Sequence, residues 1–331
     1  MIIDSKKIFL TGGTGSFGKA FVKIALKKTK VKKIIIFSRD ESKQWDMQHK
    51  FNHDKRLEFV IGDVRDEKII TKSMRGSHYV VHAAATKIVP TAETNPYECI
   101  KTNVLGSMNV INAATENNVQ KVVALSTDKA CNPANLYGAT KLCADKLFIS
   151  ERNYLQTEKT KFAVVRYGNV LGSRGSVVPF FKSLQDNQPI PITDTRMTRF
   201  VISLEECVNF VFEALSNMHG GEIFVKKIPS IKVIDIAKAI RGKKTKTKII
   251  GIRAGEKLHE EMISEHDSDN TYEFKNYYKI ISANISENKK KLIIKNAKKV
   301  RKGFFYRSDQ NKVWVNHKFL NTWIKRYPEY I

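Results

Sequence analysis

Cysteine is scarce in this chain, and its spacing excludes two kinds of architecture. The four cysteines among 331 residues are Cys99, Cys131, Cys143 and Cys207, and no two of them form a C-x-x-C pair. This spacing argues against a zinc site and against a disulfide framework. We therefore expect reduced, mostly buried thiols and no metal site.

Long apolar runs are also absent. No run of about 18 apolar residues occurs, and the opening MIIDSKKIFL lacks the apolar core of a signal peptide. We therefore expect a soluble cytoplasmic protein with no membrane partner. A chain of 331 residues exceeds the usual size of one domain, so we expect one large core and a smaller lobe.

Acidic residues are few relative to basic ones. The chain has 33 Asp and Glu against 58 Lys and Arg, a formal net charge of +25, yet only 14 of the basic residues are Arg. Proteins that read bases rely on clustered Arg, whereas these lysines are spread along the chain and are densest near its C-terminus. The charge favours a lysine-rich solvated surface and no nucleic-acid partner. A cofactor-sensing or polyanion-binding protein is the non-enzyme alternative.

Short β-rich runs alternate with helical lengths through the first half of the chain. KIFLTGG, KKIIIFSRD, LEFVIGDV, HYVVHAAA and KVVALST are separated by helical stretches from about Phe17, from about Glu67 and over 98–117, and a further strand is expected in 161–172. This alternation predicts an α/β fold with a doubly wound parallel sheet of the Rossmann type. The expected division is a dinucleotide-binding domain over 1–170, with a returning segment at about 198–226. A smaller C-terminal substrate-binding lobe and tail would cover 171–197 and 227–331, whose last fifty residues predict no element.

A glycine-rich loop follows the first predicted strand. Gly12, Gly15 and Gly18 stand in G-x-x-G-x-x-G spacing between a strand and a helix. Glycines there permit a tight turn and close approach of the backbone to a pyrophosphate, and the helix N-terminus adds donors. The pattern predicts dinucleotide binding.

The end of the second predicted strand bears on which dinucleotide is bound. Ser38, Arg39 and Lys43 suit the 2′-phosphate of NADP, whereas Asp40 could accept the 2′-hydroxyl of NAD. We expect NADP. Asp63 and Val64, which end the third strand, are expected to flank the adenine, with a turn residue as the alternative role for Asp63.

A Tyr-x-x-x-Lys spacing follows the LST sequence. Tyr137 and Lys141 share one face of a predicted helix, and an ammonium near a phenol favours the phenolate, which can take the proton of an alcohol. Thr127 is placed to hydrogen bond the same oxygen. Together with the glycine loop, this spacing predicts hydride chemistry.

At this point the sequence resembles the extended short-chain dehydrogenase/reductase superfamily, and within it the inverting UDP-N-acetylglucosamine 4,6-dehydratases that begin pseudaminic acid synthesis. The resemblance covers roughly residues 6–280. It rests on the blocks TGGTGSFGKAF, SRDESK, IGDVRD, HAAATKIVPTAETNPYECIKTN, LSTDKACNPANLYGATKL, VVRYGNVLGSRGSVVPFF, ITDTRMTRF, MHGGEIFV and IIGIRAGEKLHEEMI.

The resemblance implies that C4 of the sugar is oxidised, water is eliminated across C5 and C6, and the hydride returns to C6. It assigns Asp128 as the acid and Lys129 as the base of the elimination. A lysine base must be largely neutral, which burial and nearby Lys141 would favour, and an Asp acid needs a raised pKa.

Further site residues are implied by the resemblance, position by position. The cofactor would contact Thr14, Ser16, Phe17, Glu41, Ala83, Lys87, Val170 and Arg174 in addition to the loop and strand-end residues above. The UDP-sugar would contact Lys87, Asn169, Val177, Thr193, Arg253 and Glu256.

The chain also departs from the family pattern. AATKIVP places Thr86 and Ile88 where the family usually has a hydrophobic residue and a His, so substrate preference or rate is expected to differ. The resemblance implies a homo-oligomer, with a hexamer as the expected form, although the lysine-rich tail differs. A sugar-nucleotide 4-epimerase or reductase, and a retaining 4,6-dehydratase, remain alternatives on the same scaffold.

Overall fold

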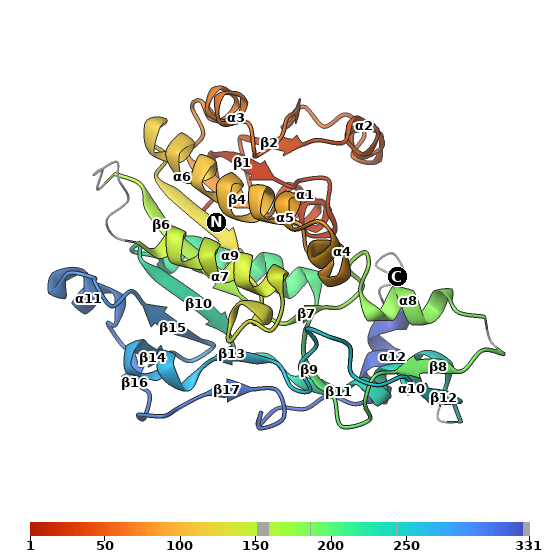
Figure 1. Cartoon of the computed structure of the whole chain (residues 1–331). Helices are drawn as coiled ribbons and strands as arrows, with labels where there is room; N and C mark the ends of the chain where they lie inside the picture. The colour runs from red at the N-terminus through yellow and green to blue at the C-terminus, as the bar shows by residue number, and fades with distance from the viewer. Residues whose placement is uncertain (151–158, 186, 243, 327–331) are drawn as a thin grey trace.

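The protein is organised around one large twisted sheet, seen in a computed structural model that describes residues 1–150, 159–185, 187–242 and 244–326 (Figure 1). The sheet has ten strands in the order β16-β14-β15-β10-β6-β5-β4-β1-β2-β3. Seven pair in parallel: β1 (Lys7–Thr11), β2 (Lys33–Ser38), β3 (Leu57–Ile61), β4 (Tyr79–His82), β5 (Lys121–Leu125), β6 (Lys161–Arg166) and β10 (Glu222–Lys226). Three pair antiparallel at one edge: β14 (Thr271–Glu273), β15 (Tyr277–Ile281) and β16 (Lys298–Lys299).

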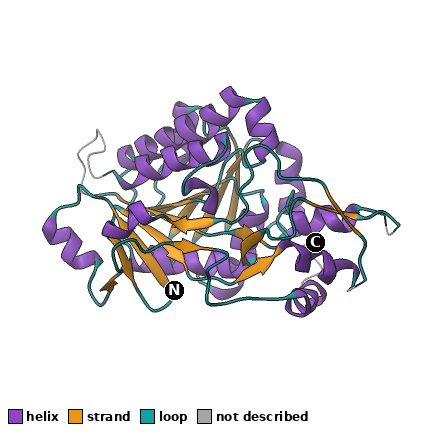
Figure 2. Cartoon of the chain, turned by 60° about the horizontal axis from the view of Figure 1, so that its bottom comes forward, coloured by secondary structure: helices purple, strands orange, loops and turns teal. Residues whose placement is uncertain are grey.

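Helices cover both faces of this sheet, which explains why its central strands read as continuous apolar runs (Figure 2). One face carries α3 (Glu67–Met74), α6 (Gly106–Glu116) and α7 (Leu136–Ile149), which pack against one another. The other face carries α1 (Ser16–Lys28) and α9 (Leu204–Asn217), joined by packing of Phe21 on Phe212. The remaining helices of this part are α2 (Glu41–Lys50), α4 (Val89–Thr94), α5 (Pro96–Ile100) and α11 (Glu287–Ile293).

A smaller lobe has its own apolar core, in which Val178, Phe181, Ile192, Ile236 and Leu320 are buried. Its strands are β7 (Asn169–Val170), β9 (Thr198–Ile202) and β11 (Ser230–Lys232) in one sheet, and β8 (Ile190–Ile192) with β12 (Thr247–Ile249). Its helices are α8 (Val177–Ser183), α10 (Val233–Arg241) and α12 (His317–Arg326). A further pair, β13 (Glu261–Ile263) with β17 (Tyr306–Arg307), packs on the large core through Met262, Ile263 and Tyr306.

The predicted α/β doubly wound fold is confirmed, and three details differ from expectation. The helix expected over 98–117 is divided by a π-helical turn at Lys101–Leu105. Residues 282–326 form α11, β16, β17 and α12, although the lysine-rich pattern of the last fifty residues predicts no element. The strands between 271 and 299, expected in the smaller lobe, extend the large sheet because β15 pairs with β10. None of the helices described in Figure 1 is long and apolar enough to span a bilayer.

Candidate active site

A cavity of about 680 Å³ opens at the carboxyl ends of β1, β4, β5 and β6. The strand order reverses here, since β1 leads to β2 and β3 on one side and β4 lies on the other. Such a switch point is where open α/β sheets bind their ligands. The cavity extends from the glycine loop to the smaller lobe, whose Asn169 and Val177 line its far wall.

The glycine loop fits a phosphate group. Gly12 has φ +64, and a Cβ on it would lie 2.8 Å from the backbone of Ala83, so only glycine fits between β1 and β4. Gly15 is the N-cap residue of α1, and no described side chain caps this helix end. The first backbone N–H groups of α1 are therefore free of side-chain acceptors, as an anion-binding helix end requires.

The end of β2 presents positive charge to the cavity. Ser38, Arg39 and Lys43 line it, and Arg39 also forms an ion pair with Asp63 at 3.6 Å. Asp40 caps α2 by accepting the backbone N–H of Lys43, and its other oxygen pairs with the Lys43 ammonium. The one carboxylate suited to a ribose hydroxyl is thus already engaged within its own helix turn.

Buried hydrogen bonds hold the end of β4 against the glycine loop. Thr11 Oγ1 accepts the N–H groups of Ala83 and Ala84 and contacts His82 Nδ1 at 2.8 Å. Burial and the Lys141 charge lower the pKa of His82 to about 3, so this imidazole is neutral.

Two hydrogen bonds close the rim of the cavity. Lys87 Nζ donates to the carbonyl oxygen of Arg174 at 2.8 Å, and the Arg174 N–H donates to Ser16 Oγ at 3.0 Å. The loop after β7 is thereby tied to both the β4 end and the start of α1. Burial lowers the pKa of Lys87.

Helix α7 carries the Tyr-x-x-x-Lys pair to the carboxyl end of β5, beside the cavity. Asn135 caps α7 by accepting the Gly138 N–H at 2.8 Å, and Asn135 Nδ2 donates to Gly255. A Cβ on Gly138 would lie 2.2 Å from the Lys129 carbonyl oxygen. The absence of that atom lets α7 pack on the Asp128–Ala130 turn, so Tyr137, Lys141, Thr127, Asp128 and Lys129 all line one cavity.

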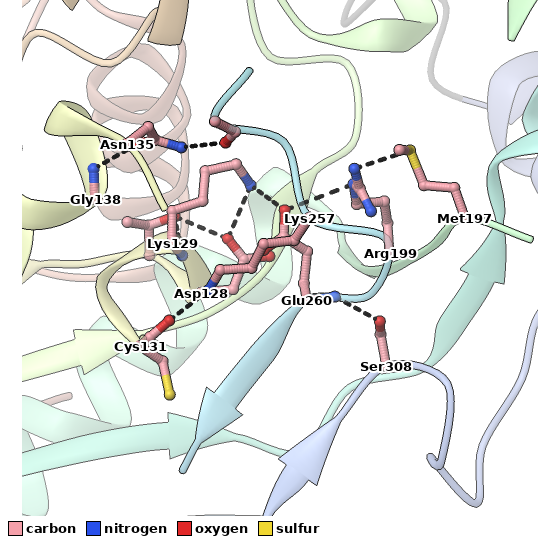
Figure 3. A network of polar contacts seen from close by, with 12 residues as sticks. Asp128, Lys129, Cys131, Asn135, Gly138, Met197, Arg199, Lys257, Glu260 and Ser308 are labelled. Atoms are coloured by element: carbon pink, nitrogen blue, oxygen red, sulfur yellow. Dashed lines mark hydrogen bonds and ion pairs between the residues drawn. The ribbon is translucent and has the colours of Figure 1, made fainter. Parts of the chain in front are cut away.

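The Lys129 ammonium lies between two buried carboxylates (Figure 3). Its Nζ is 3.1 Å from Asp128 Oδ1 and 2.9 Å from Glu260 Oε1. Thr127 Oγ1 also donates to Asp128 Oδ1 at 2.9 Å, and Arg199 Nε approaches Glu260 Oε1 at 3.6 Å. The second oxygens of both carboxylates, Asp128 Oδ2 and Glu260 Oε2, are buried and have no hydrogen-bond partner among the residues that the structure describes.

The pKa values of Asp128 and Glu260 are shifted in opposite directions. Burial and the Glu260 charge raise the pKa of Asp128 against the opposing Lys129 charge, as a general acid requires. Burial raises the pKa of Glu260 too, but the charges of Lys129 and Arg199 outweigh burial and leave it lowered. Burial therefore favours the protonated form of Asp128, and the two cations favour the ionised form of Glu260.

The expectation of a neutral Lys129 is wrong. Burial lowers its pKa, but Asp128 and Glu260 attract the ammonium more strongly and raise the pKa above its ordinary value. The expected phenolate at Tyr137 is wrong as well, because burial raises the pKa of Tyr137 to about 12. The largest opposing charge is that of Lys129, whereas Lys141 has its own pKa lowered by burial.

The sequence-predicted residues fall into three groups. The cavity is lined by Gly12, Thr14, Ser16, Phe17, Ser38, Arg39, Asp40, Lys43, Asp63, Val64, Ala83, Lys87, Thr127, Asp128, Lys129, Tyr137, Lys141, Asn169, Val170 and Val177. Gly15, Gly18, Glu41 and Arg174 lie beside lining residues but do not line it. Thr193, Arg253 and Glu256 are outside the lining, although the turn that contains Arg253 is anchored to α7 through Gly255. Sequence reasoning missed Glu260 and Arg199, whose separate positions along the chain give no local spacing to detect.

Comparison with known proteins shows which family the chain resembles. A family model described as "Polysaccharide biosynthesis protein" matches residues 8–282. The chain is 54% identical over 326 residues to a UDP-N-acetylglucosamine 4,6-dehydratase (inverting) of Campylobacter jejuni subsp. jejuni serotype O:23/36 (strain 81-176), covering 96% of this chain and 97% of the relative. It is 44% identical over 307 residues to a UDP-glucose 4-epimerase of Rickettsia bellii (strain RML369-C), covering 91% and 89%. The solved structure of Pen from Bacillus thuringiensis superposes with a TM-score of 0.89 at 35% identity and 100% coverage of both chains.

Proposed function

The chain belongs to the polysaccharide biosynthesis family that includes the inverting UDP-N-acetylglucosamine 4,6-dehydratases, and from this premise we propose that it is a hydro-lyase of that specificity. It converts UDP-N-acetylglucosamine into UDP-2-acetamido-2,6-dideoxy-β-L-arabino-hex-4-ulose, the first step of pseudaminic acid synthesis. The observation that carries the proposal is the Asp128–Lys129 pair beside Tyr137 in a single cavity.

One pocket needs both sets of residues because the two reactions depend on each other. A ketone at C4 acidifies the hydrogen on C5, and only then can the C6 hydroxyl leave. Tyr137 takes the C4 alcohol proton and passes its own phenol proton to Lys141, whose pKa is lowered by burial, and Thr127 lies beside it. Asp128 protonates the departing C6 oxygen and Lys129 removes the C5 hydrogen, each step worth about 10²–10⁴-fold in rate. A proton delivered to the opposite face of C5 inverts that centre.

NADP is the proposed cofactor, and when bound it accepts the hydride from C4 and returns it to C6. The uncapped start of α1 and the close approach at Gly12 suit its pyrophosphate. Ser38, Arg39 and Lys43 suit its 2′-phosphate, since Asp40 is occupied as a helix cap. Asp63, Val64 and Ala83 are assigned to the adenine end, and Val170 and Arg174 to the nicotinamide end.

The sugar nucleotide is assigned to the smaller-lobe side of the cavity. Lys87, Asn169 and Val177 line this side. We assign Arg253, on the turn anchored to α7 by Gly255, to the diphosphate, because a guanidinium grips it with two parallel bonds. Thr193 and Glu256 complete the assigned substrate contacts. A cytoplasmic location and a homo-oligomer, with a hexamer as the expected form, complete the proposal.

The competing function is 4-epimerisation, which the Rickettsia relative's name raises. An epimerase needs Tyr137 and Lys141 but has no use for an acid and a base at C5 and C6. Asp128→Asn and Lys129→Ala separate the two: a dehydratase loses formation of the 4-keto-6-deoxy product, followed by NMR, while an epimerase keeps most of its activity. Both variants should bind UDP, measured by calorimetry, as the unaltered protein does.

A further inference from the structure

Glu260 is a buried carboxylate that the roles above leave unused. It comes immediately before β13, far along the chain from the Asp128–Ala130 turn, and only 2% of it is exposed. Its main chain is fixed on both sides by Ser308, which accepts the Glu260 N–H through Oγ at 2.9 Å and donates its own N–H to the Glu260 carbonyl at 2.8 Å. An unneeded buried carboxylate would be costly, so its position calls for a role.

The contacts of the Glu260 side chain point toward Lys129 (Figure 3). Oε1 accepts from Lys129 Nζ at 2.9 Å, closer than Asp128 Oδ1 at 3.1 Å, and Arg199 Nε stands 3.6 Å away. The Arg199 guanidinium is itself held by the carbonyl oxygens of Thr198 and Leu258 and by Met197 Sδ. Glu260 is thus a rigid acceptor aimed at the amine that has to act as a base.

We propose that Glu260 is a positioning residue that holds the Lys129 amine and takes its ammonium proton, so that a neutral amine forms at the moment when C5 must be deprotonated. The inference rests on the proposed dehydratase function and deepens it. It also resolves why a lysine base lies between two carboxylates, since transfer within the pair needs no loss of a proton to solvent.

The protons balance over one turnover. At the start Asp128 is a carboxylic acid, Lys129 an ammonium, Glu260 a carboxylate, Tyr137 a phenol and Lys141 an amine. As C4 is oxidised, Tyr137 takes the alcohol proton and passes its own proton to Lys141. The Lys129 proton moves to Glu260, the amine takes the C5 proton, and the electrons of the C5–H bond form an enolate. The enolate forms the C5–C6 double bond as the C6–O bond breaks, and the Asp128 proton completes the departing water. When C6 is reduced, C5 takes a proton from solvent on the face opposite Lys129, and Glu260 releases its proton to solvent. Asp128 regains a proton across Thr127 from Tyr137, which recovers its own proton from Lys141.

The charged residues around Glu260 determine how the pH dependence of kcat should change when Glu260 is replaced. Glu260 faces Lys129 from the Asp128–Ala130 turn, Arg199 from β9 and Lys257 from its own segment, while Asp128 faces Lys129, Glu260 and Tyr137. Glu260 raises the pKa of Asp128, so the acid stays protonated to higher pH. Removal of the Glu260 charge therefore lowers the pH at which Asp128 loses its proton, and the alkaline limb of the activity profile moves to lower pH. Without Glu260, Lys129 becomes neutral only by losing its proton to solvent, so the acidic limb of the profile moves to higher pH.

The test is the pH profile of kcat in Glu260→Gln, with UDP-N-acetylglucosamine as substrate and the full chain loaded with NADP. We expect kcat at the optimum to fall at least about tenfold. The profile should narrow from both sides, with its acidic limb at higher pH and its alkaline limb at lower pH. Glu260→Asp keeps the charge but shortens the reach, so its kcat should be intermediate while its alkaline limb stays in place.

Glu261→Gln is the matched control, because this neighbouring carboxylate bonds Asn132 at 2.6 Å rather than Lys129, and its profile should keep the normal width. An equal loss at every pH in Glu260→Gln, or no loss, overturns the inference. If the Gln variant does not fold, a Glu260→Asp enzyme with normal kcat overturns it equally. Absence of a 4-keto-6-deoxy product from the unaltered protein at every pH instead refutes the proposed function.

Discussion

Lys87 and Arg174 join the two rims of the cavity, since Lys87 Nζ donates a 2.8 Å hydrogen bond to the carbonyl oxygen of Arg174. The bond links the segment after β4 to the loop after β7, and the latter is also tied to Ser16 at the start of α1. The segments after β4 and β7 and the start of α1 are therefore mechanically connected around the cavity.

Lys87→Met is expected to weaken ligand binding without unfolding the protein. The substitution keeps the length of the side chain but removes both its charge and its bond to the rim, so the Kd for UDP should rise about tenfold, equivalent to about 1.4 kcal/mol. Calorimetry measures the change. Lys182→Met, on the exposed side of α8, removes an equal charge and should leave Kd unchanged; equal effects of the two variants would show that only net charge matters.

Arg39→Ala is expected to change cofactor preference. Loss of a guanidinium at the end of β2 should weaken NADP by about tenfold, because a charge-assisted bond to a phosphate is lost, while NAD binding should change little. Fluorescence titration with both dinucleotides measures the ratio of the two Kd values. Lys50→Ala at the far end of α2 is the control; a parallel loss of NAD and NADP in Arg39→Ala would contradict the assignment of the 2′-phosphate.

Gly138→Ala is expected to damage both the site and the fold. The added Cβ would lie 2.2 Å from the Lys129 carbonyl oxygen, so α7 must move away from the catalytic turn. Overpacking of this kind costs about 1–3 kcal/mol in the free energy of unfolding, which urea denaturation measures. Ala139→Ser on the next position of α7 should cost little. Normal activity in Gly138→Ala would show that the close packing is unnecessary.

Acid should destabilise the protein in part through His82. Its pKa is about 3 in the folded protein and about 6.5 when unfolded, so the unfolded chain binds the extra proton between these values. The stability that His82 contributes is full above pH 6.5 and is lost as pH falls, by about 1.4 kcal/mol per pH unit for one proton. The free energy of unfolding, measured by urea at successive pH values, should therefore fall less steeply below pH 6.5 in His82→Gln. Parallel curves for the two proteins would contradict this assignment.

The sequence predicted the parts of the site that depend on local spacing. The glycine loop and the Tyr137–Lys141 pair each lie within one turn or helix, and a short pattern is enough to predict them. Glu260 and Arg199 could not be predicted, because they and Lys129 lie on three segments that are far apart in the sequence. A contact between such segments leaves no spacing pattern in the sequence. The pKa of Tyr137 was predicted in the wrong direction because the sequence shows that Lys141 is near but does not show how deeply Tyr137 is buried, and burial raises the pKa of a phenol. The edge strands β14 and β15 were missed because their lysine-rich surroundings hide a short apolar run.

The central claim is that Lys129 removes the C5 hydrogen and that a proton then returns to the opposite face of C5. Incubation of the protein with UDP-N-acetylglucosamine in heavy water, followed by NMR of the product, tests it most directly. We predict a 4-keto-6-deoxy sugar with deuterium at C5 and the L-arabino configuration. A product of D-xylo configuration, or one that retains the original hydrogen at C5, would contradict the account.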